Sequence, residues 1–166
     1  PFIAMVKISS DKNTHDYYYA HWDGTAWRQT FLANGGGRFH TSNTEYCYSG
    51  GMAIDPDDYR QVYLSCPTNG AYEIWHCTMD DNNQIAAKEQ VTAYGKANDA
   101  AAMTGGNVRP FMLPGSTGKP IRLLWMNGYY QYWIVKQGYA LGYPTAIHSA
   151  SAWEEAAPTV PKPIEW

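Results

Sequence analysis

Three aromatic segments recur along this chain at a period of about 55 residues. They begin at Tyr17, Tyr72 and Tyr130, and each has the aromatic and β-branched content typical of a β-strand. A turn signal containing Asn precedes each segment: Asn13-Thr14, Asn69-Gly70 and Asn127-Gly128. Repeats of about 40 to 55 residues with four strands each are typical of β-propellers. The repeat therefore predicts propeller blades, which are four-stranded antiparallel meanders.

The composition agrees with an all-β chain that has many turns. Aromatic residues make up 15% of the sequence and charged residues only 16%, with 15 Gly and 10 Pro. The expected strands are residues 2–8, 16–22, 26–33, 51–54, 61–65, 72–79, 88–94, 108–113, 121–126 and 130–135. Residues 85–89 and 97–103 have mild helical propensity, but both segments are too short to organise a fold.

These strands divide residues 1–149 into about 2.5–3 blades. We expect a partial blade over residues 2–33, a full blade over 51–94, and a last blade over 108–137 that lacks its closing strand. Residues 150–166, rich in Ala, Glu and Pro, are expected to form a C-terminal tail. A propeller needs at least four blades, so the remaining blades are expected from a missing N-terminal part or from another chain. The alternative is an open β-sandwich of about ten strands.

Charge and hydropathy narrow the range of partners. The net charge is −3 and no basic run is present, which argues against nucleic acid. No apolar run approaches the roughly 20 residues of a membrane span, so a membrane partner is not expected. A weakly charged, aromatic-rich surface favours sugars, whose apolar faces stack on rings. The chain starts Pro1-Phe2-Ile3, without an initiator Met or a visible signal peptide, which suggests a piece of a longer protein or a processed product.

Three cysteines, Cys47, Cys66 and Cys77, allow at most one disulfide within the chain, and their spacing is no standard zinc signature. Cys47 and Cys66 are expected near the ligand face together with His40, so a structural metal ion is conceivable there. Free buried thiols are the alternative.

In a propeller, the loops from strand two to three and from strand four to the next strand one share the face that binds the ligand. Residues 11–15, 34–50, 67–71, 95–107 and 127–129 are expected on this face. The candidate catalytic residues are His40, Tyr46 and Tyr48. The candidate substrate-binding residues are Arg38, Arg109, Asn107, His15 and Tyr129.

Arg, His and Tyr on one face fit β-elimination at a uronate. An Arg neutralises the carboxylate and acidifies the neighbouring C–H, a His or Tyr removes the proton, and a second such group protonates the leaving oxygen. This chemistry requires no metal and no redox cofactor.

The most acidic cluster in the chain is interpreted as a turn. Pro56 presets φ for a turn, and the side chains of Asp55, Asp57 and Asp58 can bond the nearby backbone. We expect this turn on the face opposite the ligand loops, so these residues are not paired catalytic carboxylates. His21 and His76 lie in the middle of expected strands and are interpreted as structural.

Residues 16–27, with the pattern Tyr…Trp-Asp-Gly…Trp, resemble a hairpin of BNR-repeat-like β-propellers. Residues 48–65 and 107–130 resemble a blade start and the last blade of the same group, which is related to ulvan lyases and to rhamnose–glucuronate lyases and rhamnosidases. The resemblance covers about residues 17–135. It implies the C-terminal part of a seven-bladed, secreted or periplasmic enzyme that acts on uronate-containing glycans. It also implies that the main catalytic residues lie in earlier blades.

Three functions are compatible with the expected fold. The first is a polysaccharide lyase that is active only with the rest of the ring. The second is a glycoside hydrolase of the rhamnosidase or sialidase type, and the third is a non-catalytic glycan-binding propeller.

Overall fold

A computed structural model describes residues 1–37, 44–45, 49–69, 71–93, 103–131, 133–134 and 145–150. The strands in these ranges are β1 (Phe2–Ile8), β2 (His15–Trp22), β3 (Trp27–Gly36), β4 (Thr44–Glu45), β5 (Met52–Ile54), β6 (Gln61–Thr68), β7 (Ala71–Met79), β8 (Ile85–Gln90), β9 (Met103–Met112), β10 (Leu123–Gln131), β11 (Trp133–Ile134) and β12 (Thr145–Ala150). The same ranges contain no helix. The prediction of an all-β chain is confirmed.

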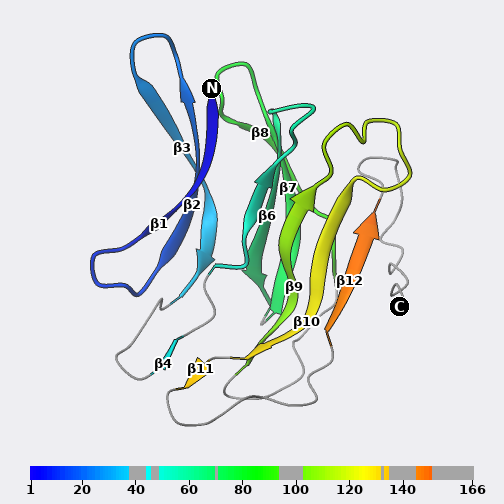
Figure 1. The fold of residues 1–166 in the computed structure, drawn as a ribbon. Helices are drawn as coiled ribbons and strands as arrows, with labels where there is room; N and C mark the ends of the chain where they lie inside the picture. The colour runs from blue at the N-terminus through cyan, green and yellow to red at the C-terminus, as the bar shows by residue number, and fades with distance from the viewer. Residues whose placement is uncertain are drawn as a thin grey trace.

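The strands form three antiparallel meanders, which lie side by side in Figure 1. The first is β1-β2-β3, the second is β5-β6-β7-β8, and the third contains β9, β10 and β12. One parallel pairing, between Tyr72 and Gly106, links β7 to β9 and joins the second and third meanders into one seven-stranded sheet. β4 and β11 form a separate antiparallel pair.

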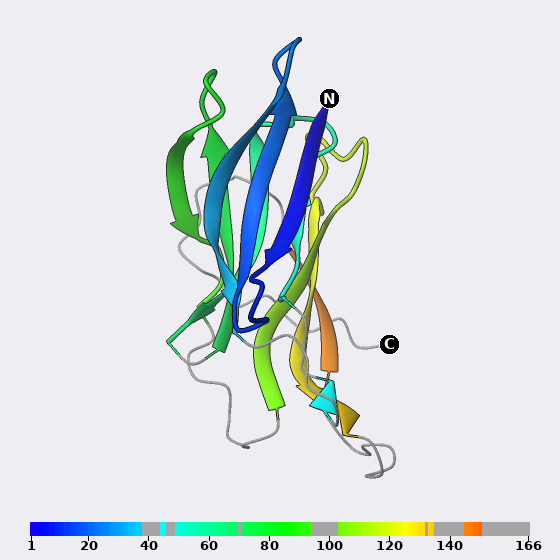
Figure 2. The same ribbon diagram turned by 90° about the vertical axis from the view of Figure 1, so that its left-hand side faces the viewer.

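The second meander is packed on both faces. A first core cluster fills the space between it and the first meander: Tyr17, Tyr19, Leu32, Ala33, Val62, Leu64, Cys66, Cys77 and Met79. A second cluster lies on its other face, against the third meander: Tyr63, Ile74, Met112, Leu123 and Trp125. Figure 2, seen with β1–β3 towards the viewer, shows the first meander in front of the others. The three meanders of the described part of the chain therefore form a stack of three layers, one more than a β-sandwich has.

The position of the second meander between two core clusters explains the composition of β6. Residues 62–66 of β6 are all buried, although a strand with one solvated face would alternate. Its Val-Tyr-Leu-Ser-Cys run therefore supplies apolar side chains to two cores at once.

Aspartate side chains stabilise two of the turns between strands. The Asp23 carboxylate accepts hydrogen bonds from the backbone N–H groups of Thr25 and Ala26 at 2.8 Å each, and Gly24 has φ +105°. The Asp80 carboxylate likewise accepts from the N–H groups of Asn82 and Gln84. Both are side chains that cap the turn they belong to.

Three sequence-based expectations are wrong. Asn127 and Gly128 do not form a hairpin, because β10 runs unbroken through them and pairs with β9 on one side and β12 on the other. Met103 to Asn107 belong to β9 rather than to a loop. β12 lies in a region where the sequence pattern had suggested no strand. In each case, pairing with a neighbouring strand overrides the local signal.

Tyr17 ties the first meander to the second. Its side chain is fully buried, and its hydroxyl donates to the carbonyl of Ser65 at 2.8 Å. The same hydroxyl accepts from the N–H of Gly51 at 2.9 Å. It therefore bridges the end of the β5–β6 ladder, where two backbone groups depend on it.

Tyr17→Phe should lower the free energy of unfolding by about 2 kcal/mol, because the partly buried Gly51 N–H loses its acceptor. Urea unfolding measures the loss. Tyr18→Phe is the matched control, since Tyr18 points to the opposite face of β2, and it should change stability by less than about 0.5 kcal/mol. Equal effects of the two substitutions would contradict the bridging role of Tyr17.

Candidate functional site

The strand connections separate into two ends of the stack. Residues 9–14, between β1 and β2, and Asn69, between β6 and β7, lie at one end, which we call the loop end (Figure 1, bottom). The turns at 23–26, 55–60, 80–84 and 113–122 lie at the other end, which we call the turn end. Antiparallel strands require this alternation. The Asp-Pro-Asp-Asp segment is thus a turn at the end opposite residues 9–14, as the sequence predicts.

The three meanders meet near the loop end at the residues just before β5. The carbonyl of Gly50 accepts a hydrogen bond from the N–H of Arg109 in β9 at 2.6 Å. The N–H of Gly51 donates to the Tyr17 hydroxyl of β2. We call Tyr17, Gly50, Gly51 and Arg109 the three-meander junction. It brings β5 and β9, the first strands of the second and third meanders, next to each other.

Arg109 has an unusual backbone for a strand residue. Its φ is +57°, and within the described ranges the other non-glycine residues with positive φ, Lys12, Asn69 and Asn83, all lie in turns. Val108 pairs with Met126 and Phe111 with Leu124, so Arg109 and Pro110 together oppose Trp125 in a β-bulge. A left-handed conformation costs a non-glycine residue about 1–2 kcal/mol. Such strain is found most often at functional sites.

The junction holds this conformation in place. Arg109 N–H is bonded to Gly50, and a side chain on Gly51 would lie 3.3 Å from the Cα of Arg109. Despite these backbone contacts, Arg109 is exposed to solvent. The bulge therefore places an exposed Arg109 where β5 and β9 approach each other.

A buried polar group lies beside the junction. Tyr72 packs against Gly50, and its hydroxyl donates to the carbonyl of Gly35 at 3.2 Å. His15 is 2% exposed, and its Nδ1 lies 3.6 Å from the place that a side chain on Gly36 would take. Burial lowers the pKa of His15 below its usual value, so the ring is mostly neutral at pH 7. His15, a candidate for substrate binding, thus lies in the interior.

The structure places only part of the predicted site. Arg38, His40, Tyr46, Cys47 and Tyr48 lie outside the described residues. Asn107 and Tyr129 occupy paired positions in β9 and β10, opposite Asn127 and Gly105 respectively, and their side chains also lie outside the description. The side chains of Arg109 and His15 lie in the described part of the chain.

Two described cysteines, Cys66 and Cys77, are free thiols in the first core cluster. Burial raises the pKa of Cys66 to about 12 and that of Cys77 to about 11. Both thiols are therefore protonated at neutral pH and poorly suited to bind a metal or act as nucleophiles. Within the described ranges, no group of three or more His, Cys, Asp or Glu residues could hold a metal ion.

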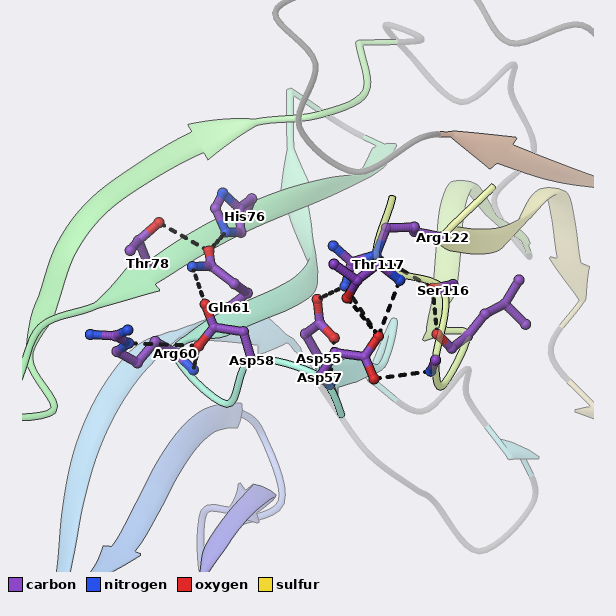
Figure 3. A network of polar contacts seen from close by, with 12 residues as sticks. Asp55, Asp57, Asp58, Arg60, Gln61, His76, Thr78, Ser116, Thr117 and Arg122 are labelled. Atoms are coloured by element: carbon purple, nitrogen blue, oxygen red, sulfur yellow. Dashed lines mark hydrogen bonds and ion pairs between the residues drawn. The ribbon is translucent and has the colours of Figure 1, made fainter. Parts of the chain in front are cut away.

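No local sequence signal indicates the ion pair between Asp55 and Arg122, which lies at the turn end (Figure 3). Arg122, just before β10, forms an ion pair with the buried carboxylate of Asp55, and its Nη2 lies 3.8 Å from Asp57. The Asp57 carboxylate also accepts from Gly115 N–H and Thr117 Oγ1, both at 2.9 Å. The Gly115 hydrogen bond is the main reason that the pKa of Asp57 lies below its usual value.

We call Asp55, Asp57, Thr117 and Arg122 the turn clamp. It joins the β5–β6 turn to the β9–β10 turn and so fixes the second meander against the third. Its groups satisfy one another, which indicates a structural role and agrees with the interpretation of these aspartates as non-catalytic.

A second polar chain continues from the same turn (Figure 3). The Asp58 carboxylate accepts from Gln61 Nε2 at 3.1 Å, so Gln61 Oε1 faces His76 Nε2 at 2.6 Å. His76 Nδ1 lies 3.2 Å from Glu89. Burial lowers the pKa of His76, while its contact with Glu89 opposes this shift. Both ring nitrogens of His76 thus lie within hydrogen-bond distance of a neighbouring side chain, which indicates a structural role.

Comparisons with known proteins add no relative. A scan against family models, a search of curated proteins and a search of solved structures each found no match for this chain. In the described part of the chain, no helix has the length and apolar character to cross a membrane.

Proposed function

We propose that the three meanders are consecutive blades of a β-propeller that binds uronate-containing glycans, most consistent with a polysaccharide lyase. Each meander packs face to face on the next, as blades do around a ring. The two end faces of the stack support further packing. Ile3, Trp22, Trp27 and Phe31, on the outer face of the first meander, are each at least 41% exposed.

The opposite end face of the stack has the same character. Phe111 and Ile147 lie on the outer face of the third meander and are 55% and 41% exposed. Exposed apolar faces of this kind mark interaction surfaces. In our proposal, neighbouring blades of the same ring cover both faces.

The position and exposure of Arg109 are the main support for an acidic ligand. Arg109 stands exposed at the seam between β5 and β9, which are the innermost strands if the meanders are blades. An Arg in this position can bind a carboxylate through two parallel hydrogen bonds. Holding it in a left-handed conformation costs stability, and a binding role gives a reason for that cost.

The lyase chemistry follows from this anchor. Pairing with Arg109 would neutralise the uronate carboxylate and make the neighbouring C–H more acidic, so that a His or Tyr could remove the proton. We propose His40, Tyr46 and Tyr48 for proton transfer, and Arg38, Asn107 and Tyr129 for holding the sugar; His15 is buried and is not proposed to contact it. Blades outside this chain would complete the catalytic set.

Arg109→Gly should weaken binding of a uronate-containing polysaccharide by about tenfold or more, because a charged hydrogen-bond donor is lost. The same change should leave the free energy of unfolding unchanged or raise it by about 1 kcal/mol, because glycine adopts φ +57° without strain. Calorimetric titration of the ring-complete protein, with a neutral polysaccharide as control ligand, measures the first effect. Urea unfolding measures the second.

Arg109→Lys is the matched variant, since it keeps the charge and loses the planar fork. It should retain part of the binding. Equal loss of binding to the acidic and the neutral polysaccharide would count against a carboxylate anchor. For the reaction, ultraviolet absorbance of an unsaturated uronate identifies a lyase, whereas new reducing ends without that absorbance would show a hydrolase.

A further inference from the structure

β1 lies at an open edge of the first meander. Within the described ranges it pairs only with β2. It also exposes a row of apolar side chains, with Phe2, Ile3, Val6 and Ile8 between 36% and 42% exposed. A long apolar edge strand is a template for pairing with another strand.

The second meander shows how the equivalent edge is filled. The repeat aligns β2 with β7, so that Ala20 corresponds to Trp75. Ile3 pairs with Ala20 and Leu64 pairs with Trp75, so β1 corresponds to β6. In β6 the residues equivalent to Phe2, Ile3 and Ala4 are Tyr63, Leu64 and Ser65, which are at most 1% exposed. The edge of β6 is covered by β5.

The backbone N–H and C=O groups of β1 and β6 point in equivalent directions as well. Trp22 N–H donates to Pro1 O and Ser9 N–H donates to Thr14 O, so the odd-numbered residues of β1 bond to β2. The peptide groups of Phe2, Ala4, Val6 and Ile8 therefore point to the open edge. In β6 the equivalent of Ala4 is Ser65, whose N–H donates to Gly51 O at the start of β5 at 2.9 Å.

We propose that the open edge of β1 is a strand-acceptor site, filled by an extended antiparallel segment of the same kind as β5. The segment would pair with Phe2, Ile3 and Ala4, present small or apolar residues, and complete a four-stranded meander like the second one. This inference rests on the stacked-blade part of the proposed function and not on glycan binding. The Arg109 experiment can therefore fail while the strand-acceptor site holds.

A donor-strand graft tests the proposal. A copy of residues 50–61 is joined directly ahead of Pro1 in the full chain, because Gln61 precedes Val62, the residue that corresponds to Pro1. The graft should slow amide hydrogen exchange at Ala4 by about tenfold or more and raise the thermal midpoint. The control graft carries Ala53→Pro in the copy, which removes the N–H that would face Phe2. It should give neither effect.

Three outcomes would overturn the proposal. The first is unchanged exchange at Ala4 in a grafted chain whose circular dichroism shows intact strands. The second is equal protection by the graft and by its proline control. The third is protection of Ala4 in the ungrafted chain that rises with concentration as light scattering reports a dimer, because the occupant would then be β1 of a second copy.

Discussion

Asp55→Ala is expected to lower the free energy of unfolding by about 3–5 kcal/mol, because it leaves the Arg122 guanidinium without its buried partner. The Asp55 side chain is 1% exposed and that of Arg122 is 11% exposed, so water can replace little of the lost contact. Asp57 stays 3.8 Å from Arg122 Nη2, but its carboxylate is already shared with Gly115 and Thr117. Urea unfolding of the full chain measures the effect.

Two further variants make the experiment specific to the turn clamp. Asp55→Ala combined with Arg122→Met removes both charges and should recover much of the loss, because no unpaired charge stays buried. Asp81→Ala breaks the exposed Arg60–Asp81 pair, where Asp81 is 93% exposed, and should cost at most about 1 kcal/mol. A loss at Asp55 as small as that at Asp81 would show that the clamp does not hold the two meanders together.

Only part of the turn clamp could be predicted from the sequence. The Asp-Pro-Asp-Asp turn was predictable, because proline and aspartate act on their own backbone. Its partner was not, because Arg122 lies 67 residues from Asp55 and nothing near Arg122 indicates pairing with that turn. Strand β1 and the turns at Asp23 and Asp80 belong to the predictable class, since each depends on residues within a few positions.

At Asn127-Gly128 and at Arg109, the local sequence favours a backbone conformation that the structure does not have. An Asn-Gly pair is a strong hairpin signal, yet here both residues lie inside β10 between two partner strands, whose pairing outweighs a local turn preference. Arg109 precedes Pro110, and residues before proline favour extended backbone. Its φ of +57° arises from the bulge and from Gly50, neither of which the local sequence reveals. The candidate site depends on such long-range contacts, so less of it than of the strands could be predicted.

Gly106→Ala should be as destabilising as the loss of Asp55, at about 3–5 kcal/mol of unfolding free energy. An alanine Cβ at this position would lie 2.3 Å from the backbone oxygen of Tyr72 and 2.6 Å from its nitrogen. Backbone atoms cannot turn away as a flexible side chain can, so β9 and β7 would have to separate at the one place where they pair. Gly106 also has φ +123°, which alanine rarely adopts.

Gly24→Ala separates the two causes of this expected loss. Gly24 has a similar φ of +105°, but no atom lies within 4 Å of the place an added Cβ would take. It should therefore cost only the conformational part, about 1–2 kcal/mol. The difference between the two variants measures the steric contact of Gly106 with Tyr72, and equal losses would mean that β7 and β9 do not approach so closely. Because Arg109 is three residues further along β9, Gly106→Ala should also displace the guanidinium and weaken acidic-glycan binding in the ring-complete protein, whereas Gly24→Ala should leave binding unchanged.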